Sequence, residues 1–419
     1  MKTTDFKRYI LLFLEELEKN SLIDSVYRNP HFDDDPKFFS FEALLKSTLK
    51  VSDGENNSVE GYGCLFTSET EALFKALAEF IERLSQNIYK ESSLLKSTFN
   101  QLKNQALDPY LYTKEVSDRD KNLHWVKGFR INNIPCLIPA QQIYLNYKKV
   151  LDKVVLSDLN STGAAGGFSL ESAVVRGIYE VIERDAFMTM FLTKIPPIRI
   201  NLESINNKLI QKMISSCKKY NLCLELFEIT NDIKIPTFMA MLIDRTSLGP
   251  CVGIGTKSSL SIMEAVTGCL QESFQTRTWL RKDMIELGSK RYSVNPQNIN
   301  TFRERGLYWS SVKMLKHFDY LFKQSKKTIR TDLKDVPSNE FRFLKDIFDK
   351  KNMEVFYVNL SLRIFKKHRY YVCKTIIPAL QPLILNEKHR VINHARLKSV
   401  SNYFGFNKYK INPLPQPFL

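Results

Sequence analysis

A short acidic pattern, Glu-x-x-Glu-Arg, occurs twice in this chain of 419 residues, at residues 79–83 and 180–184. Residues three apart on a helix share a face, so both carboxylates of a copy can reach one ligand. Mg²⁺ is often held by carboxylates together with phosphate oxygens, and an adjacent arginine can donate two hydrogen bonds to a phosphate. The repeated pattern therefore indicates Mg²⁺ bound with a phosphate compound. The alternative for each copy is a solvated helix face with ordinary salt bridges.

Two helices must carry these patterns. Apolar residues at helical spacing predict one helix over residues 69–90, and Ser68-Glu-Thr-Glu71 forms a capping box at its start. The second helix is predicted over residues 170–191, with Ser169 as its N-cap. Glycine-bearing segments precede both helices. We expect them to be loops whose small residues let a phosphate approach the backbone N–H groups. The alternative is a turn that requires positive φ.

Two further segments carry candidate chemistry. A third predicted helix, over residues 258–283, bears Glu272-Ser-Phe-Gln275, although a polar helix face is the simpler alternative. The chain ends in alternating prolines, Pro413, Pro415 and Pro417, which favour a stiff, extended tail. Such a tail can enter a site at low entropic cost, whereas the usual alternative is a frayed terminus.

Composition excludes several classes of protein. No run of about 18 apolar residues exists, so we expect no membrane span. Seven cysteines without a Cys-x-x-Cys pair predict neither a disulfide framework nor a zinc site, and favour a cytoplasmic location. The net charge of +16 fits an anionic partner or a lysine-rich, solvated surface. No pattern typical of a nucleic-acid-binding fold is present, so we expect no nucleic acid partner.

The order of the elements predicts a mixed α/β protein in which a loop-then-helix unit is duplicated. An amphipathic helix is expected over residues 5–20, followed by a polar, irregular segment over residues 21–58. We therefore divide the chain into an N-terminal extension, 1–57, and a main domain, 58–419. Strands are predicted at 123–149, 221–228, 237–244 and 250–255.

As a set, these motifs resemble the YcaO superfamily. The resemblance rests on both acidic helices, the glycine-rich segment 161–167, Glu272-x-x-Gln275, the segments Trp125-Val-Lys-Gly and Ile138-Pro-Ala-Gln, and the proline-rich end. It implies an ATP-binding fold with a pseudo-duplicated arrangement of sheets and helices. It also implies that Mg²⁺ and ATP activate a peptide amide by phosphorylating its oxygen. The Pro-x-Pro-x-Pro end is typical of the azoline-forming cyclodehydratase branch.

The resemblance assigns three groups of residues. The implied metal ligands are Glu79, Glu82, Glu180, Glu183 and Glu272. The implied ATP contacts are Ser68, Arg83, Ala165, Gly166, Gly167, Arg184, Gln271 and Gln275. The implied catalytic tail residues are Pro413, Pro415, Pro417 and Leu419.

The chain departs from the family pattern at four positions. Phe168 stands where relatives often have Asn, and Ser172 stands where they often have Glu. In the tail, Gln416 and Leu419 replace residues that are often His and Pro. We therefore expect the carboxylates of the acidic helices to supply most of the metal binding, with less help from the glycine-rich segment.

The resemblance also implies partners. Residues 1–57 do not resemble a peptide-recognition domain, so we expect a stand-alone subunit that acts on a precursor peptide. A separate ThiF-like protein would bind the leader of that peptide, a flavin-dependent dehydrogenase could then oxidise the azolines, and the subunit itself is expected to be a homodimer. Two alternatives stay open: a thioamide- or amidine-forming relative, and an ATP-binding partner subunit with weakened catalysis.

Overall fold

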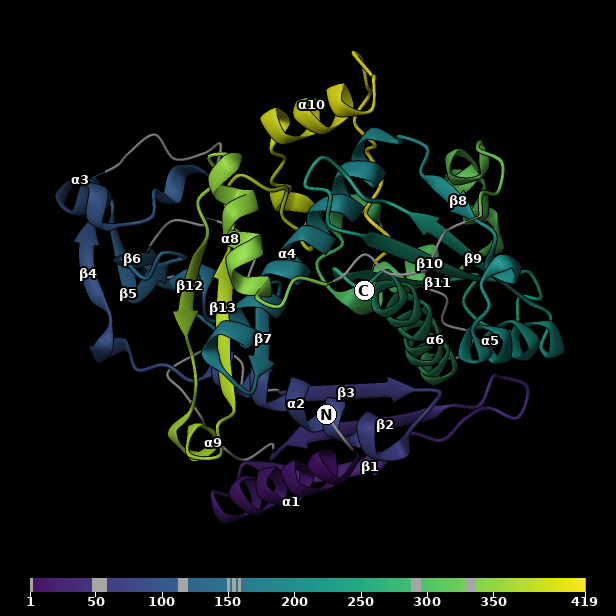
Figure 1. Cartoon of the computed structure of the whole chain (residues 1–419), viewed down its shortest axis with the longest axis horizontal. Helices are drawn as coiled ribbons and strands as arrows, with labels where there is room; N and C mark the ends of the chain where they lie inside the picture. The colour runs from purple at the N-terminus through teal and green to yellow at the C-terminus, as the bar shows by residue number, and fades with distance from the viewer. Residues whose placement is uncertain are drawn as a thin grey trace. The chain divides into compact units, whose positions relative to one another are not determined.

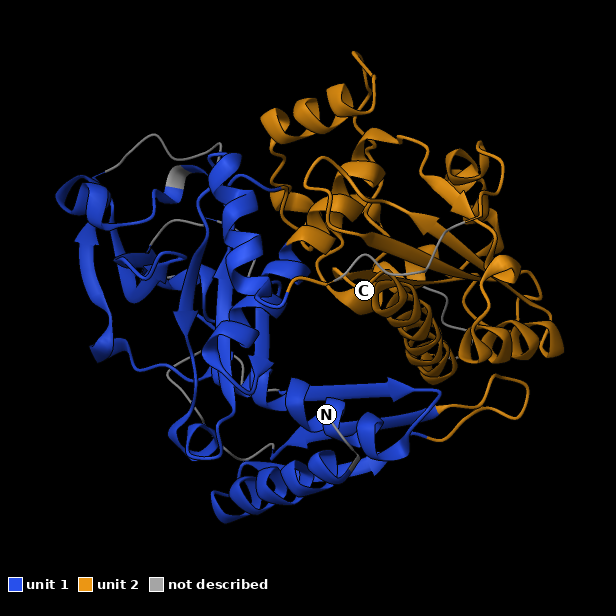
Figure 2. Cartoon of the chain, in the orientation of Figure 1, with its two compact units in different colours: residues 1–29, 39–181, 338–380 blue, residues 30–38, 182–337, 381–419 orange. Residues whose placement is uncertain are grey.

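The computed structural model describes residues 3–46, 59–111, 120–148, 151–152, 156, 160–287, 295–328 and 336–418. The chain forms two compact units (Figures 1 and 2). Unit 1 comprises Met1–Asn29, Phe39–Val181 and Ser338–Leu380, and unit 2 comprises Pro30–Phe38, Ile182–Pro337 and Gln381–Leu419. This division differs from the expected split into 1–57 and 58–419. That split stays a prediction, and its boundary residues lie outside the described residues.

Unit 1 contains two antiparallel sheets. The first has the strand order β1 (Ile23–Arg28), β2 (Phe39–Leu45), β3 (Glu60–Leu65). The second has the order β4 (Leu95–Thr98), β5 (Asn122–Arg130), β12 (Phe356–Asn359), β13 (Tyr371–Ile376), β7 (Ala164–Gly167), and β6 (Pro135–Pro139) also pairs with β5. The helices are α1 (Thr3–Lys19), α2 (Glu69–Asn87), α3 (Phe99–Leu102), α8 (Glu340–Lys350) and α9 (Arg363–Lys366).

Helix α2 packs on β3 and β2, and α1 packs on α2. Helix α2 begins where the sequence predicts, because the Ser68 side chain accepts a hydrogen bond from Glu71 N at 3.2 Å. The apolar stripe of α2 enters the largest hydrophobic core of unit 1, where Leu77, Phe80 and Ile81 are fully buried. Burial of this stripe fixes the opposite face of the helix, which carries Glu79 and Glu82.

Unit 2 contains one antiparallel sheet with the order β11 (Val252–Ser258), β10 (Thr237–Asp244), β9 (Leu222–Glu228), β8 (Ile198–Ile200). Its helices are α5 (Lys208–Lys219), α6 (Ile262–Leu287), α7 (Phe302–Trp309) and α10 (His394–Tyr403). Helix α4 (Leu170–Thr193) contributes residues to both units. The mixed α/β class is therefore confirmed, with antiparallel pairing in every sheet.

Buried ion pairs hold the two long helices of unit 2. Arg277 of α6 binds Asp35 at 3.1 Å and Asp244 at 2.9 Å, and all three side chains are almost inaccessible to solvent. Asp185 of α4 is bound by Arg396 of α10 at 2.7 Å. Removing one partner of such a pair leaves an uncompensated buried charge, so these contacts fix α4 and α6 in place.

The prediction that residues 21–58 are irregular is wrong for the described part, because β1 and β2 lie there. The alternating Phe39 and Phe41 of β2 pack with α2, and pairing with β3 completes the sheet. The predicted strand region over 123–149 is shorter than expected. It contains β5, which ends at Arg130, and β6, which ends at Pro139, and a 3₁₀ turn follows. Pairing between strands therefore outweighs the polar composition of residues 21–46. In residues 123–149, the pairing stops before the predicted end of the strand region.

The two glycine-bearing segments are strands, not loops. Gly61 and Gly63 belong to β3, and a Cβ added at Gly63 would lie 1.9 Å from Ala72 O of α2. In the second segment, residues 164–167 form β7, which pairs with β13. Within residues 161–167, only Gly163 has positive φ, at 83°. Glycine in β3 is therefore needed for the close approach of strand and helix rather than for a turn.

Gly63→Ala is expected to destabilise the protein by about 3 kcal/mol, because the added methyl group forces β3 and α2 apart. Gly405→Ala serves as the control. Gly405 has a φ of 80° but open space around its Cβ position, so only the backbone preference is lost, at about 1 kcal/mol. Urea unfolding of both variants measures the difference, and equal stabilities would contradict the packing argument.

Candidate functional site

Three helix carboxylates are held by a backbone N–H from the strand region that precedes their helix. The bonds are Tyr62 N to Glu79 Oε2 at 2.9 Å, Gly163 N to Glu180 Oε2 at 3.2 Å, and Thr256 N to Glu272 Oε2 at 2.6 Å. The donor precedes its acceptor by 17, 17 and 16 residues. The unit of strand and acidic helix therefore occurs three times, whereas the sequence pattern indicated only two copies.

The third copy, β11 followed by α6, most closely matches the first. Gly253-Ile-Gly255 in β11 packs on α6 as Gly61-Tyr-Gly63 packs on α2, and a Cβ at Gly255 would lie 2.2 Å from Cys269 O. The Gly-x-Gly pattern before the helix was the signal that could have identified this copy. The sequence predicts a strand over 250–255, which β11 confirms, but it does not predict that this strand belongs to a repeat.

In unit 1, Glu82 lies among other carboxylates. Its Oε1 accepts a hydrogen bond from Gly166 N at 2.6 Å. Burial, then the charge of Glu79 and to a lesser degree that of Glu180, raises the pKa of Glu82 to about 8. Like charges held together on two helices repel each other, and a bound cation would relieve that repulsion. Gly166, expected to offer its N–H to a phosphate, offers it to this carboxylate.

The same cluster contains a lysine that sequence analysis missed. Lys374 of β13 is 3% exposed, and its Nζ donates to Asn160 O at 2.7 Å. Burial lowers the pKa of Lys374 to about 7, against the opposing charge of Glu180. A single lysine within the apolar run 370–377 was the available signal. Arg83, which was predicted to contact a phosphate of ATP, donates a hydrogen bond to Glu79 Oε1 at 2.6 Å.

In unit 2, Glu183 is almost completely buried and accepts three hydrogen bonds. The donors are Thr256 Oγ1 at 2.7 Å, Arg184 Nη1 at 2.7 Å and Ser258 N at 3.2 Å. Burial and the charge of Glu183 raise the pKa of Glu272 to about 7. Glu183 and Glu272 therefore form a second, closely coupled carboxylate pair, partly balanced by Arg184.

Arg184 connects this pair to the proline-rich tail. Its Nη1 also donates to Thr256 Oγ1 at 2.9 Å, and its guanidinium lies 4.0 Å from the centroid of the Phe418 ring. Phe418 is 2% exposed and also contacts the Phe187 ring at 5.6 Å. The tail therefore reaches the acidic helix α4 within unit 2.

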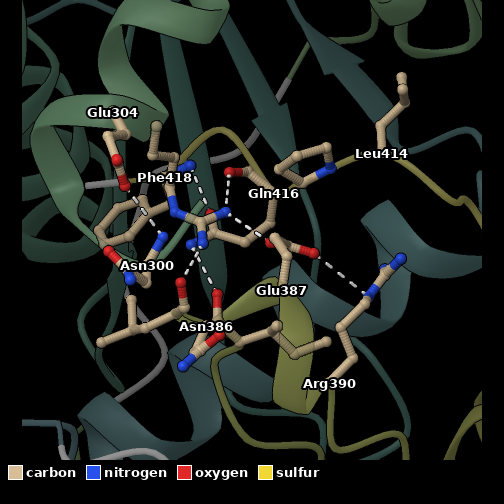
Figure 3. A network of polar contacts seen from close by, with 12 residues as sticks. Asn300, Glu304, Asn386, Glu387, Arg390, Leu414, Gln416 and Phe418 are labelled. Atoms are coloured by element: carbon tan, nitrogen blue, oxygen red, sulfur yellow. Dashed lines mark hydrogen bonds and ion pairs between the residues drawn. The ribbon is translucent and has the colours of Figure 1, made fainter. Parts of the chain in front are cut away.

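Side-chain donors hold the tail backbone, and Figure 3 shows the polar contacts around Gln416 and Glu387. Arg305 donates to Gln416 O at 2.8 Å, Trp309 donates to Pro415 O at 3.1 Å, and Arg390 donates to Pro413 O at 3.0 Å. Pro415 and Pro417 are buried, whereas Pro413 is exposed. Leu419 lies outside the described residues. The described tail is therefore anchored rather than frayed.

The other predicted ATP contacts lie as follows. Ala165, Gly166 and Gly167 are in β7, Ser68 caps α2, and Gln275 is partly buried on α6. Gln271 is buried, and its Nε2 donates to Thr267 O at 3.3 Å. Phe168, the departure from the family pattern, contacts Tyr9 of α1 at 4.5 Å and thereby joins an aromatic core. Their roles toward ATP stay predictions.

The carboxylates fit Mg²⁺ bound jointly with phosphate. Among the residues that the structure describes, no three His, Cys, Asp or Glu side chains are grouped so as to hold a metal ion alone. Mg²⁺ commonly takes one or two carboxylates, substrate phosphates and water. Glu82 lies near Glu79 and Glu180, and Glu272 lies near Glu183, so each unit brings together carboxylates that a bound cation would neutralise.

Glu82→Gln is expected to stabilise the metal-free protein at high pH. The folded-state pKa of about 8 lies above the ordinary value of 4.5, so the folded protein binds a proton that the unfolded chain has lost. The free energy of unfolding of the wild type therefore rises as pH falls from above 8 toward 4.5. The variant has no carboxyl group at this position and does not show this rise. We expect the variant to melt about 3 °C or more above the wild type at pH 9 in EDTA, and the gap to narrow below pH 8 and to close near pH 4.5. Glu171→Gln, at an exposed site on α4, should show no such pH dependence, and a constant gap would contradict the assignment.

A family model described as "YcaO cyclodehydratase, ATP- and Mg²⁺-binding" matches residues 66–381. The chain belongs to the YcaO family. Its expected cofactors, ATP and Mg²⁺, are those in the family's description. An uncharacterized protein of Methanothermobacter thermautotrophicus is 25% identical over 340 residues, which cover 78% of this chain and 83% of that protein.

Solved structures share the YcaO fold. A heterocyclase in complex with substrate and cofactor has a TM-score of 0.77 at 16% identity, over 97% of this chain and 57% of that one. The heterocyclase TruD has a TM-score of 0.61 at 17% identity, over 83% of this chain and 50% of TruD. The chain thus spans about half the length of these two YcaO proteins. The YcaO protein of Methanopyrus kandleri bound with AMPPCP and Mg²⁺ has a TM-score of 0.66 at 16% identity, over 94% of each chain. In the described part of the present YcaO chain, no helix is both long and apolar enough to cross a membrane.

Proposed function

We propose that this chain is an ATP-dependent cyclodehydratase subunit. It would form thiazolines or oxazolines from Cys, Ser or Thr in a ribosomally made precursor peptide. The observation that carries this proposal is the anchored proline-rich tail, which brings Phe418 onto Arg184 beside the buried Glu183. The resemblance implies that the tail of the azoline-forming branch reaches the active site. The Phe418–Arg184 contact supports the same role here, because Arg184 lies on the acidic helix α4.

The carboxylates have a defined role in this proposal. Glu79, Glu82 and Glu180 of unit 1, and Glu183 and Glu272 of unit 2, would hold Mg²⁺ together with the phosphates of ATP. Bound ATP would supply the phosphoryl group that converts the peptide amide oxygen into a good leaving group. Arg184 and Lys374 would limit the build-up of negative charge, and the backbone N–H donors fix the carboxylates before the ligand binds.

The partners belong to the same proposal and rest on the sequence resemblance. A separate ThiF-like protein would bind the leader of the precursor peptide, and a flavin-dependent dehydrogenase could oxidise the rings. The similar microcin synthetase structures from E. coli, at 13% identity and a TM-score of 0.63, are of a multi-protein complex, one with pro-microcin bound. A homodimer and a cytoplasmic location belong to the same proposal.

A second candidate is a thioamide- or amidine-forming enzyme. The sequence resemblance leaves this alternative open, because the family includes members that activate an amide with ATP for a different nucleophile. Both candidates share ATP-dependent activation of an amide, but they differ in the nucleophile. The mass of the product peptide separates them.

The test is incubation of the full chain with ATP, Mg²⁺, the partner protein and the precursor peptide, followed by intact-mass spectrometry. We expect the loss of one water per ring, together with release of ADP and phosphate. Replacement of oxygen by sulfur would support the second candidate instead. ATP binding with an unmodified peptide would indicate a partner subunit with weakened catalysis and would overturn the proposal.

A further inference from the structure

A buried tyrosine hydroxyl lies beside the unit 1 carboxylates. Tyr370, between α9 and β13, is 1% exposed, and its hydroxyl lies close enough to Glu82 to interact with it, although the contact does not meet ordinary hydrogen-bond geometry. A buried hydroxyl without a well-formed hydrogen bond costs about 1–3 kcal/mol relative to a satisfied one. A phenylalanine would fill the same space without that cost, so the hydroxyl needs an explanation.

The position of Gly166 shows what the hydroxyl faces. A Cβ at Gly166 would lie 2.0 Å from the Tyr370 hydroxyl and 2.8 Å from Glu82 Oε1. The two oxygens therefore border the same small space above β7. Gly166 does not have a positive φ, so glycine is required here by space and not by backbone conformation. The glycine leaves room for the hydroxyl and the carboxylate to approach each other.

The tyrosine ring cannot turn away from this space. It contacts Phe13 of α1 edge-on at 4.8 Å and Phe168 edge-on at 5.7 Å. Phe168 stands where relatives often have a polar residue, so this chain holds the tyrosine by aromatic packing. Side chains locked by packing are the ones that can orient a ligand-binding group reliably.

We propose that Tyr370 is a positioning residue for Glu82. When Mg²⁺ and ATP bind, its hydroxyl donates to Glu82 Oε1, which already accepts from Gly166 N at 2.6 Å. Two donors on Oε1 fix the rotation of the carboxylate and leave Oε2 for the metal. Hydrogen bonds of this kind are often long in the unliganded state and shorten on binding. The inference rests on the proposed function, because it takes Glu82 as a Mg²⁺ ligand.

The test compares Tyr370→Phe with Tyr9→Phe. Tyr9 belongs to the same aromatic cluster and contacts Phe168 at 4.5 Å and Phe13 at 5.8 Å, so its variant also removes a hydroxyl from that cluster. Calorimetry measures Mg²⁺ binding to the full chain in the presence of a non-hydrolysable ATP analogue. We expect Tyr370→Phe to weaken the apparent Mg²⁺ affinity about tenfold, and Tyr9→Phe to leave it unchanged.

Each outcome decides between explanations. A wild-type Mg²⁺ affinity in Tyr370→Phe would overturn the positioning role. Equal weakening of the Mg²⁺ affinity in both variants would also overturn it, because the effect would then come from packing alone. Thermal unfolding of both variants establishes that they are folded. Ring formation by the wild type together with unchanged Mg²⁺ affinity in Tyr370→Phe overturns this inference alone. Absence of Mg²⁺ binding by the wild type would overturn the proposed function with it.

Discussion

Replacing Glu183 by glutamine is expected to lower Mg²⁺-dependent ATP consumption about a hundredfold or more. Glu183 is 3% exposed and lies in the same acidic group as Glu272, so the substitution removes a charge that Mg²⁺ would use. Glutamine keeps the shape and one acceptor oxygen, which can still accept from Thr256 and Arg184, whereas its NH2 group replaces the oxygen that accepts from Ser258 N. Alanine would remove the carboxylate that accepts from Thr256, Ser258 and Arg184, and the loss of stability would confuse the result. Release of phosphate from ATP measures the effect.

The matched control is Glu171→Gln. Glu171 lies in the first turn of the same helix and is exposed. It loses the same charge without touching either carboxylate group, so ATP consumption should stay at the wild-type level. A Glu183→Gln protein that is folded and consumes ATP at the wild-type rate would remove Glu183 from the metal site. A loss of activity in both variants would point to the charge of α4 as a whole.

The acidic helices could be predicted because their signals are local. The cap at Ser68 and the apolar stripe behind it place α2, and the same reasoning places α4 and the strand β10, whose observed bounds match the prediction. Helical spacing also brings Glu79 and Glu82 to one face. None of this depends on residues far away in the chain, so a single sequence was sufficient.

The glycine-bearing strands could not be predicted, because their partners are distant. Residues 164–167 become a strand only by pairing with β13, about 200 residues later in the chain. Isolated, such a run of small residues has little preference for a strand, and a loop was the natural expectation. The same distance explains why Lys374 was missed: its approach to Glu180 follows from the pairing of β13 and not from any local pattern.

The tail could be predicted only in part. Alternating prolines indicate stiffness, but they do not say which donors will hold the backbone. Those donors are Arg305, Trp309 and Arg390, which no sequence pattern connects to the tail. The stacking of Phe418 on Arg184 likewise depends on the fold of unit 2. The proline pattern therefore predicted an extended tail, but the residues that the tail contacts follow only from the three-dimensional fold.

Phe418→Ala is expected to lower ring formation about tenfold or more while Mg²⁺–ATP still binds. The aromatic ring covers one face of the Arg184 guanidinium, and a buried contact of this kind contributes about 2 kcal/mol. Without the ring, Arg184 can leave Glu183, and the end of the tail loses its deepest anchor. The metal ligands themselves are unchanged, which is why nucleotide binding should survive. Intact-mass spectrometry of the peptide and calorimetry with an ATP analogue measure the two properties separately.

Two further variants separate the cation–π contact from simple packing. Phe418→Leu fills much of the same cavity without an aromatic face, so it should restore most of the stability that alanine loses but not the full rate of ring formation. Phe404→Ala removes an aromatic ring that is 41% exposed near the end of α10 and should change neither property. Wild-type activity in Phe418→Leu would reduce the role of Phe418 to packing. Wild-type activity in Phe418→Ala would contradict the tail as part of the site, because the aromatic contact with Arg184 is what connects the tail to the acidic helix.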